Sequence, residues 1–252
     1  MKSLPRWAGD ERIWPETPAG ESDWMKHRIA KYPKFSFFPI LVFLVGVAPP
    51  SIEPVSRHGF FEAEVRIDPA TLHLAGNRDA SVILLEFSDY RCPSCMKFNM
   101  TVLPHLRQTF IDPGKIAYAF VDAPLSTTDR GILLPRAAFC AAKQGHFWDF
   151  HDWLFLHPTH AGIEAVQAAA KAVSLDLPAL ETCLSSEESK RIVLASQETA
   201  QRLGVSATPA FFVGWRKSEN LYAGKWVRGA EHYFVYRYLI EKALRAVEGS
   251  AH

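Results

Sequence analysis

An apolar run that ends in a pair of cysteines constrains the fold of this chain more than any other feature. Residues 82–87 (VILLEF) have the composition of a strand buried on both faces, and Cys92 and Cys95 follow directly after a short polar stretch. We expect a helix over about residues 92–110 and a second strand over residues 115–121. A strand, a helix and a strand in this order imply two parallel strands, and therefore an α/β core.

Further strands flank a long helical stretch. The pattern predicts strands over residues 60–67, 210–213 and 221–227, and a closing helix over residues 231–247. Between residues 135 and 203 one helical pattern follows another, with Ala-rich stretches and no strand candidate. We therefore expect an α/β domain whose strands are interrupted by a block of helices.

The cysteine pair has the residues that thiol–disulfide exchange requires. At the start of a helix, Cys92 meets free backbone N–H groups and the positive end of the helix dipole, which stabilise a negative sulfur. Cys95 lies one turn further along and is expected to be more buried, where it can release a mixed disulfide. Pro93 suits the first helical turn, and Ser94 can donate its hydroxyl to the thiolate.

Two other uses of this cysteine spacing stay open. A structural zinc site needs about four ligands, but no second closely spaced pair exists, and His146 and His151 lie in a helical pattern among aromatic residues. An inert disulfide is less favoured, because a strand-to-helix junction exposes the first sulfur. Thiol exchange is the preferred interpretation, and it implies no metal and no organic cofactor.

The amino-terminal region indicates export. Residues 35–52 carry no charge, basic residues precede them, and the first basic residue afterwards is Arg57, so residues 1–34 are expected in the cytoplasm. The apolar centre is shorter than the ~20 residues of a full span, which suits a signal sequence or a membrane anchor, cleaved or uncleaved. Met25 begins a stretch typical of a signal-peptide head, and we take it as a hypothetical translation start. Residues 53–71 are expected to form a linker and the first strand.

The charge balance identifies no partner. The chain has 28 basic and 27 acidic residues and a formal net charge of +1. Such a balance gives no excess of positive charge for nucleic acid, and we expect no nucleic-acid partner.

Three motifs, in order along the chain, resemble the DsbA-like branch of the thioredoxin superfamily. They are residues 76–80 (GNRDA), 85–95 (LEFSDYRCPSC) and 204–213 (GVSATPAFFV). The resemblance covers about residues 72–244. It implies an α/β thioredoxin fold over residues 72–252, with a mixed central sheet flanked by helices and an inserted all-helical subdomain over about residues 129–203.

The resemblance also implies roles for single residues. Cys92 attacks, Cys95 resolves, and Pro209, preceded by a cis peptide bond, packs beside them. Glu86 takes the place of an acid that assists proton movement at the buried cysteine; a solvent-facing strand residue is the alternative. Substrate contacts are expected at Pro93, Ser94, Ala207 and Thr208.

A second cysteine pair and an aromatic cluster lie in the helical block. Some relatives bridge the corresponding helices, so the resemblance implies a structural disulfide between Cys140 and Cys183, with two buried free thiols as the alternative. The aromatic residues within 147–155 could line a peptide groove, but their helical spacing favours a buried core. Substrate contact is expected instead from the backbone beside Pro209.

The resemblance implies a protein thiol–disulfide oxidoreductase of the periplasm or cell envelope. Its substrates would be unfolded or cysteine-containing proteins, and a membrane redox partner would recycle the cysteine pair. Export favours an oxidant, but Pro-Ser between the cysteines differs from the Pro-His of strongly oxidising members and leaves the redox direction open. The alternatives are a reductase or isomerase and a redox-inactive peptide-binding chaperone. An intracellular enzyme that uses glutathione is less favoured.

Overall fold

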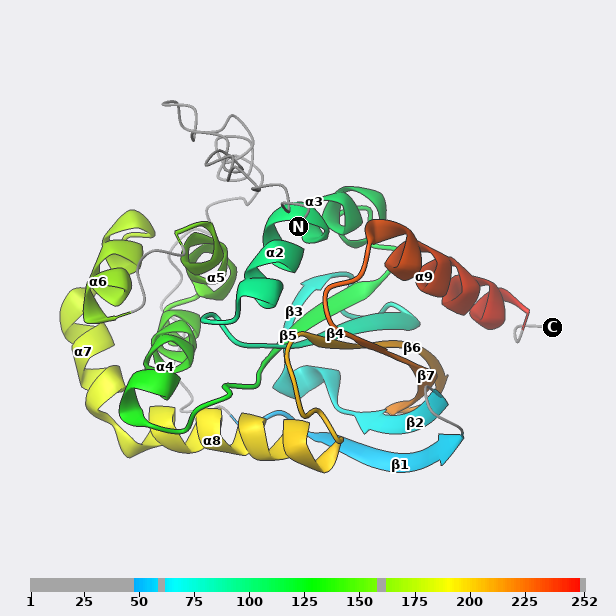
Figure 1. Ribbon diagram of the computed structural model, residues 1–252, viewed down its shortest axis with the longest axis horizontal. Helices are drawn as coiled ribbons and strands as arrows, with labels where there is room; N and C mark the ends of the chain where they lie inside the picture. Colours follow the sequence, from blue (N-terminus) through cyan, green and yellow to red (C-terminus); the bar gives the residue numbers. More distant parts are fainter. Residues whose placement is uncertain (1–47, 59–61, 158–161, 250–252) are drawn as a thin grey trace, which may run out of the picture. The chain divides into compact units, whose positions relative to one another are not determined.

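A computed structural model describes residues 48–58, 62–157 and 162–249 (Figure 1). The expected amino-terminal tail, the hypothetical start at Met25 and most of the apolar segment 35–52 lie outside these residues. Within the described part of the chain, no helix has both the length and the apolar composition needed to cross a membrane.

The described residues form a mixed sheet of seven strands in the order β1-β2-β7-β6-β4-β5-β3. The strands are β1 (Ile52–His58), β2 (Glu62–Ile67), β3 (His73–Gly76), β4 (Val82–Ser88), β5 (Ala117–Asp122), β6 (Ala210–Ser218) and β7 (Leu221–Arg228). The pair β4 and β5 is parallel, as the sequence predicts, and the other neighbours are antiparallel. Every residue of β4 is buried, because helices cover both faces of the sheet at its centre.

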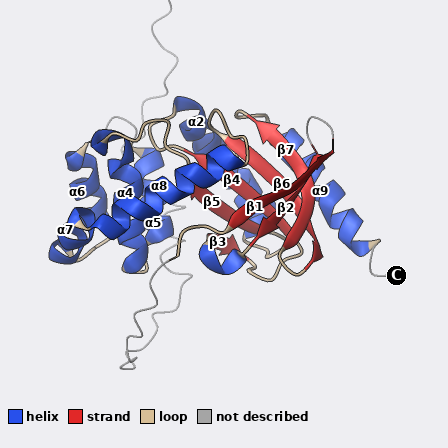
Figure 2. Cartoon of the chain, turned by 90° about the horizontal axis from the view of Figure 1, so that it is seen from below, coloured by secondary structure: helices blue, strands red, loops and turns tan. Residues whose placement is uncertain are grey.

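Different helices cover the two faces (Figures 1 and 2). On one face, α2 (Pro93–Thr101), α3 (Leu103–Leu106) and α9 (Tyr233–Glu248) pack on side chains such as Leu84 and Phe211. On the other face, the end of α8 packs on side chains such as Phe212. The predicted helix 92–110 is divided into α2 and α3, and a π-helical segment, η2 (Arg107–Ile111), follows α3.

A block of helices separates β5 from β6. Its members are α4 (Asp129–Lys143), α5 (Phe147–Leu156), α6 (Ile163–Ala172), α7 (Leu177–Ser185) and α8 (Glu187–Arg202). Thr128, Asp176 and Ser186 cap three of them by accepting a hydrogen bond from a backbone N–H in the first turn. The expected thioredoxin fold with an inserted helical subdomain is confirmed.

The aromatic residues of α5 belong to the core of the helical block. Phe147, Phe150 and Phe155 are buried, and His151 is 0% exposed. The core interpretation of this cluster is therefore correct.

The disulfide implied by the resemblance is present: Cys140 on α4 and Cys183 on α7 are joined, with a Cα–Cα distance of 5.8 Å.

Two segments differ from the sequence prediction. The expected linker contains a complete strand, β1, which pairs with β2 to form a hairpin that adds to β7. The pairing has an irregularity between Pro54 and Ser56, which obscured the alternation of a strand in the sequence. The strand predicted over residues 210–213 is longer than expected: Gly214 lies inside β6, whose pairing with β7 extends to Ser218. The turn is made by Asn220, which has a positive φ of 58°.

Removing the disulfide should lower the free energy of unfolding. The Cys140→Ala/Cys183→Ala variant loses a cross-link between residues 43 positions apart. The chain-entropy model assigns about 4 kcal/mol to such a loop. Urea denaturation of wild type and variant, followed by circular dichroism, measures the change. As a control, reductant should lower the midpoint of the wild type more than that of the variant. Equal midpoints without reductant would contradict the prediction.

Candidate active site

The cysteine pair lies where β4 gives way to α2, as predicted. Cys92 is the N-cap residue of α2, and Pro93 occupies the first helical position. Both thiols are free, with Cys92 9% exposed and Cys95 0% exposed. Cys92 is more covered than expected, because its thiol donates a hydrogen bond of 3.4 Å to the carbonyl oxygen of Thr208. The first sulfur is nevertheless the more accessible of the two.

The loop before β6 lies beside Cys92. The bond between Thr208 and Pro209 is cis, as the resemblance implies, and Pro209 is buried. Ala207 is exposed and Thr208 partly exposed next to the first sulfur, while Pro93 and Ser94 are exposed on the helix side. The residues expected to contact substrate thus lie on two segments that meet at Cys92.

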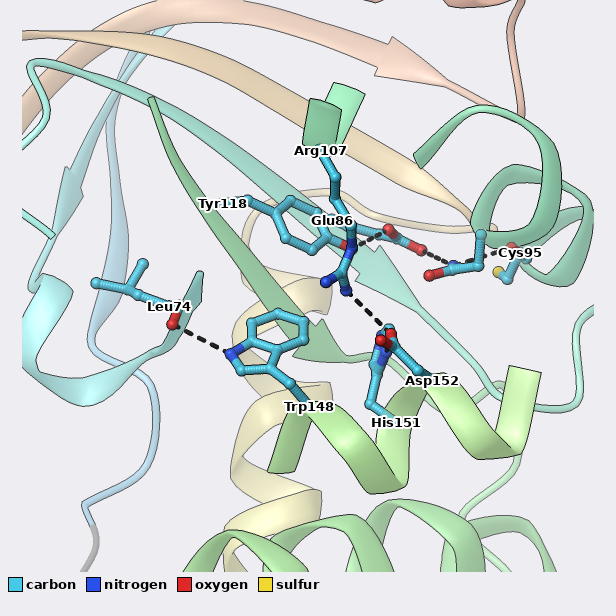
Figure 3. Close-up of polar contacts among 9 residues, drawn as sticks. Leu74, Glu86, Cys95, Arg107, Tyr118, Trp148, His151 and Asp152 are labelled. Atoms are coloured by element: carbon cyan, nitrogen blue, oxygen red, sulfur yellow. Dashed lines mark hydrogen bonds and ion pairs between the residues drawn. The ribbon is translucent and has the colours of Figure 1, made fainter. Parts of the chain in front are cut away.

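Glu86 lies beneath α2 and is 0% exposed, so the solvent-facing alternative is wrong. The Tyr118 hydroxyl donates to Oε2 over 2.6 Å, and the Asn99 amide donates to Oε1 over 2.9 Å (Figure 3). The same amide group donates to the Cys95 carbonyl oxygen over 3.0 Å. Burial raises the pKa of Glu86 from 4.5 to about 7, although the hydrogen bonds from Tyr118 and Asn99 and the nearby Ser88 hydroxyl partly offset the rise.

The Cys95 sulfur strongly favours the protonated thiol over the thiolate. Burial raises the pKa of Cys95 well above its usual range, and the negative charge of Glu86 raises it further. The nearby polar groups of Ser88, Asp89 and Thr208 act in the opposite direction. Cys95 therefore needs a base to become a nucleophile, and a proton donor when it leaves a disulfide.

Sequence reasoning missed Asn99 and Tyr118. Asn99 follows Cys95 by four residues, so helical periodicity alone places it on the same face of α2. Tyr118 is brought to Glu86 by the parallel register, in which Leu84 pairs with Tyr118 and Glu86 pairs with Phe120. That register cannot be read from the sequence of either strand.

A cavity of about 480 Å³ opens beside the loop that carries the cis bond. Residues 203–210 form one wall, and the end of β7, with Trp226 and Arg228, forms another. Glu62, from the hairpin β1–β2, completes the rim. The lining is mainly apolar, with the charged residues Glu62 and Arg228, and it includes the exposed residue Ala207.

Polar contacts fasten the helical block to the sheet domain (Figure 3). Arg107 of η2 forms an ion pair of 2.9 Å with Asp152 of α5, and its guanidinium lies 5.5 Å from the ring centre of Trp148. The Trp148 indole donates to the carbonyl oxygen of Leu74 over 3.1 Å. His151 and Asp152 also interact, at 3.1 Å.

The part of the chain that the structure describes contains no cluster of three or more side chains that could hold a metal ion.

Comparisons with known proteins agree with this geometry. The family described as Thioredoxin matches residues 68–228. Disulfide bond formation protein D of Bacillus subtilis is 28% identical over 152 residues, which are 58% of this chain and 68% of that protein. The Na(+)/H(+) antiporter NhaA 3 of Salinispora tropica is 28% identical over 168 residues, 66% of this chain, and the match spans 25% of the antiporter.

Solved structures have the same fold. BdbD from Bacillus subtilis, in the oxidised form, superposes with a TM-score of 0.60 at 27% identity, covering 69% of this chain and 93% of that chain. The α-DsbA1 structure from Wolbachia pipientis has a TM-score of 0.63 at 22% identity, covering 71% of this chain and 94% of that chain. The latter is a likeness in fold.

Glu86 should make the protein less stable as the pH rises. The unfolded chain loses this proton near pH 4.5 and the folded chain near pH 7, so the folded state binds more protons in between. The free energy of unfolding therefore falls across this window, by about 3 kcal/mol from this group. Glu86→Gln cannot titrate and should gain stability relative to wild type as the pH passes through the window.

Urea denaturation of the reduced proteins below pH 4.5 and above pH 7 measures the difference. Glu198→Gln, which changes an exposed carboxylate on α8, is the matched control and should follow the wild type. A difference between Glu86→Gln and wild type that does not change with pH would contradict the assignment.

Proposed function

Because the chain belongs to the thioredoxin family, in its DsbA-like branch, we propose that it is a protein thiol–disulfide oxidoreductase of extracytoplasmic proteins. The single observation that carries the proposal is the asymmetry of the cysteine pair. Cys92 is partly accessible at a helix start beside the loop of Pro209, whereas Cys95 is fully buried close to a carboxyl group. The Cys92 sulfur can therefore react with a protein substrate, whereas the Cys95 sulfur can react only with Cys92.

We assign the oxidising direction to this pair. With Cys92 and Cys95 joined, a substrate thiolate attacks the Cys92 sulfur, a mixed disulfide forms, and Cys95 leaves as a thiolate. The raised pKa of Cys95 favours immediate protonation, and Glu86, whose pKa of about 7 keeps it partly protonated at neutral pH, is the nearest donor. A second substrate thiolate then attacks the substrate sulfur and releases Cys92. Two substrate thiols become a disulfide, and the enzyme becomes a dithiol.

The substrate is proposed to bind in an extended conformation. The exposed backbone of Ala207 and Thr208 can pair with a cysteine-containing segment as an added strand, which tolerates many sequences. The cavity beside this loop can take an apolar side chain of the same segment, and Pro93 and Ser94 border the opposite side. Unfolded chains, which expose such segments, are therefore the proposed substrate class.

The remaining parts of the proposal concern location and recycling. Residues 35–52 serve as a signal sequence or membrane anchor that places the domain of residues 72–252 outside the cytoplasm. A membrane redox partner must reoxidise the dithiol after each turnover, since the reaction consumes the enzyme disulfide.

A second candidate function, disulfide reduction or isomerisation, is favoured by Ser94. Its hydroxyl replaces the histidine found between the cysteines of strongly oxidising relatives. The reduction potential of the isolated domain against glutathione separates the two. A value near about −120 mV supports an oxidant, and a value near about −270 mV supports a reductase.

Single serine variants test the asymmetry of the two cysteines. Cys95→Ser should accumulate a mixed disulfide through Cys92 when it is incubated with a substrate that carries a disulfide, because no second thiol resolves the intermediate. Cys92→Ser should form no such adduct and should lose exchange activity. Mass spectrometry of acid-quenched samples identifies the linked cysteine. Full biological activity of Cys92→Ser would show that the protein acts as a peptide-binding module instead.

A further inference from the structure

The sheet face beneath α2 carries more polar side chains than Glu86 alone. Glu86 and Ser88 alternate along β4 and therefore point to the same face. In the parallel register, Ser88 pairs with Asp122, the last residue of β5, so Asp122 shares this face as well. The Tyr118 hydroxyl, bound to Glu86, comes from the same face of β5. Two acids thus lie on one face of the sheet, and Ser88 is a neighbour of both: it follows Glu86 on β4 and pairs with Asp122 on β5. We refer to Glu86, Ser88, Asp122 and Tyr118 as the polar row.

Several atoms in or beside this row lack hydrogen-bond partners. Among the described residues, Ser88 Oγ, Tyr90 Oη and Asp122 Oδ1 are buried without a hydrogen bond of normal length. Buried polar atoms are nearly always paired, and groups left unpaired frequently belong to functional sites. Ser88 nevertheless lies close enough to Glu86 and Cys95 to lower the pKa of both. The charges of Asp122 and Glu86 both raise the pKa of Tyr90, which places this side chain near both acids.

The proposed reaction needs a path for protons between the buried Cys95 and solvent, which Glu86 cannot provide alone. Cys95 gains a proton when the enzyme disulfide opens and loses it again when the disulfide closes, so Glu86 must exchange a proton in every cycle. Glu86 is 0% exposed beneath α2. Asp122, at the end of its strand, is partly exposed as a residue, although its Oδ1 is buried. It is the most exposed member of the row.

We propose that Asp122 is a proton-relay residue that links Glu86 and Cys95 with solvent through the Ser88 hydroxyl. The inference rests on the proposed function and deepens it. When Cys95 leaves as a thiolate, Glu86 gives it a proton. The Ser88 hydroxyl then donates its proton to Glu86 and accepts one from Asp122, and solvent restores the proton of Asp122. No electron moves in these steps, and the same path runs in reverse when Cys95 becomes the nucleophile.

Electrostatics agree with this path. Burial, together with a smaller effect of the charge of Asp89, raises the pKa of Asp122 from 3.8 to about 7, and the pKa of Glu86 is also about 7. A proton can therefore pass between them at little cost in free energy. Asp89 is a poorer relay, since its two oxygens accept the backbone N–H groups of Arg91 and Leu125.

The surroundings of Asp122 supply few competing charges. The titratable groups that face the row are Asp89, Glu86, Tyr90, Tyr118 and Cys95. From α5, His151 contacts the rings of Tyr90 and Phe120. From α8, the neutral amide of Gln197 donates to the carbonyl oxygen of Pro124. The negative charge of Asp89, together with burial, favours the protonated form of Asp122 that the relay requires.

The test is the single-turnover rate at which the oxidised protein reacts with an excess of a reduced cysteine peptide, measured across a range of pH and corrected for the thiolate fraction of the peptide. In the wild type, the corrected rate should fall as the pH rises through about 7, as Asp122 and Glu86 lose their protons. Asp122→Asn should react ~10-fold or more slowly below this pH, and the fall with pH should become smaller. Ser88→Ala should have the same effect without altering any charge.

Asp112→Asn, which changes an exposed carboxylate after η2, is the matched control and should retain the wild-type rate and pH profile. A wild-type rate and pH profile in both Asp122→Asn and Ser88→Ala would overturn the inference. If circular dichroism shows that Asp122→Asn is unfolded, Ser88→Ala decides alone. Wild-type protein without any turnover would overturn the proposed function itself, and the relay with it.

Discussion

The parallel pairing of β4 with β5 is the constraint on which the rest of this structure depends. It buries β4 on both faces, and it directs the chain from the end of β4 into the first turn of α2. The helix start receives Cys92, and one turn later the helix places Cys95 over the same strand. The register also brings Tyr118 to Glu86 and Asp122 to Ser88. A shift of the pairing would separate Tyr118 from Glu86 and Asp122 from Ser88.

The polar groups beneath α2 oppose the stability of the domain. A carboxyl group buried at neutral pH loses part of its hydration, and three hydrogen-bonding neighbours compensate Glu86 only in part. Asp122 and Tyr90 leave buried oxygens without partners. The inserted helical block acts in the other direction, through the bridge between Cys140 and Cys183 and through an apolar core that extends to Tyr90, Cys92 and Cys95. The cysteine pair thus lies between a stabilising apolar core and the buried polar groups that oppose stability.

Much of this arrangement was predictable from the sequence because it depends on local features. The strand of residues 82–87, the helix start at Cys92 and the long helical stretch follow from composition and periodicity. The cis bond before Pro209 and the bridge between the helices needed the resemblance to a family. Tyr118, Asn99 and Asp122 escaped prediction, because their role comes from strand register and from the helix position above the sheet. β1 escaped because Pro54 and an irregular register break its alternation.

The hairpin of β1 and β2 also changes which strand lies at one edge of the sheet, where other chains could pair with it. Without it, β7 would present a long row of unpaired backbone groups, which is a template for aggregation. The edge strand is instead β1, which contains Pro54, a residue with no N–H to donate, and an irregularity of register beside it. The opposite border is β3, which has only four residues. If the protein acts on unfolded chains as proposed, both edges of its sheet resist the addition of such chains, which leaves the backbone beside Pro209 as the place for them to pair.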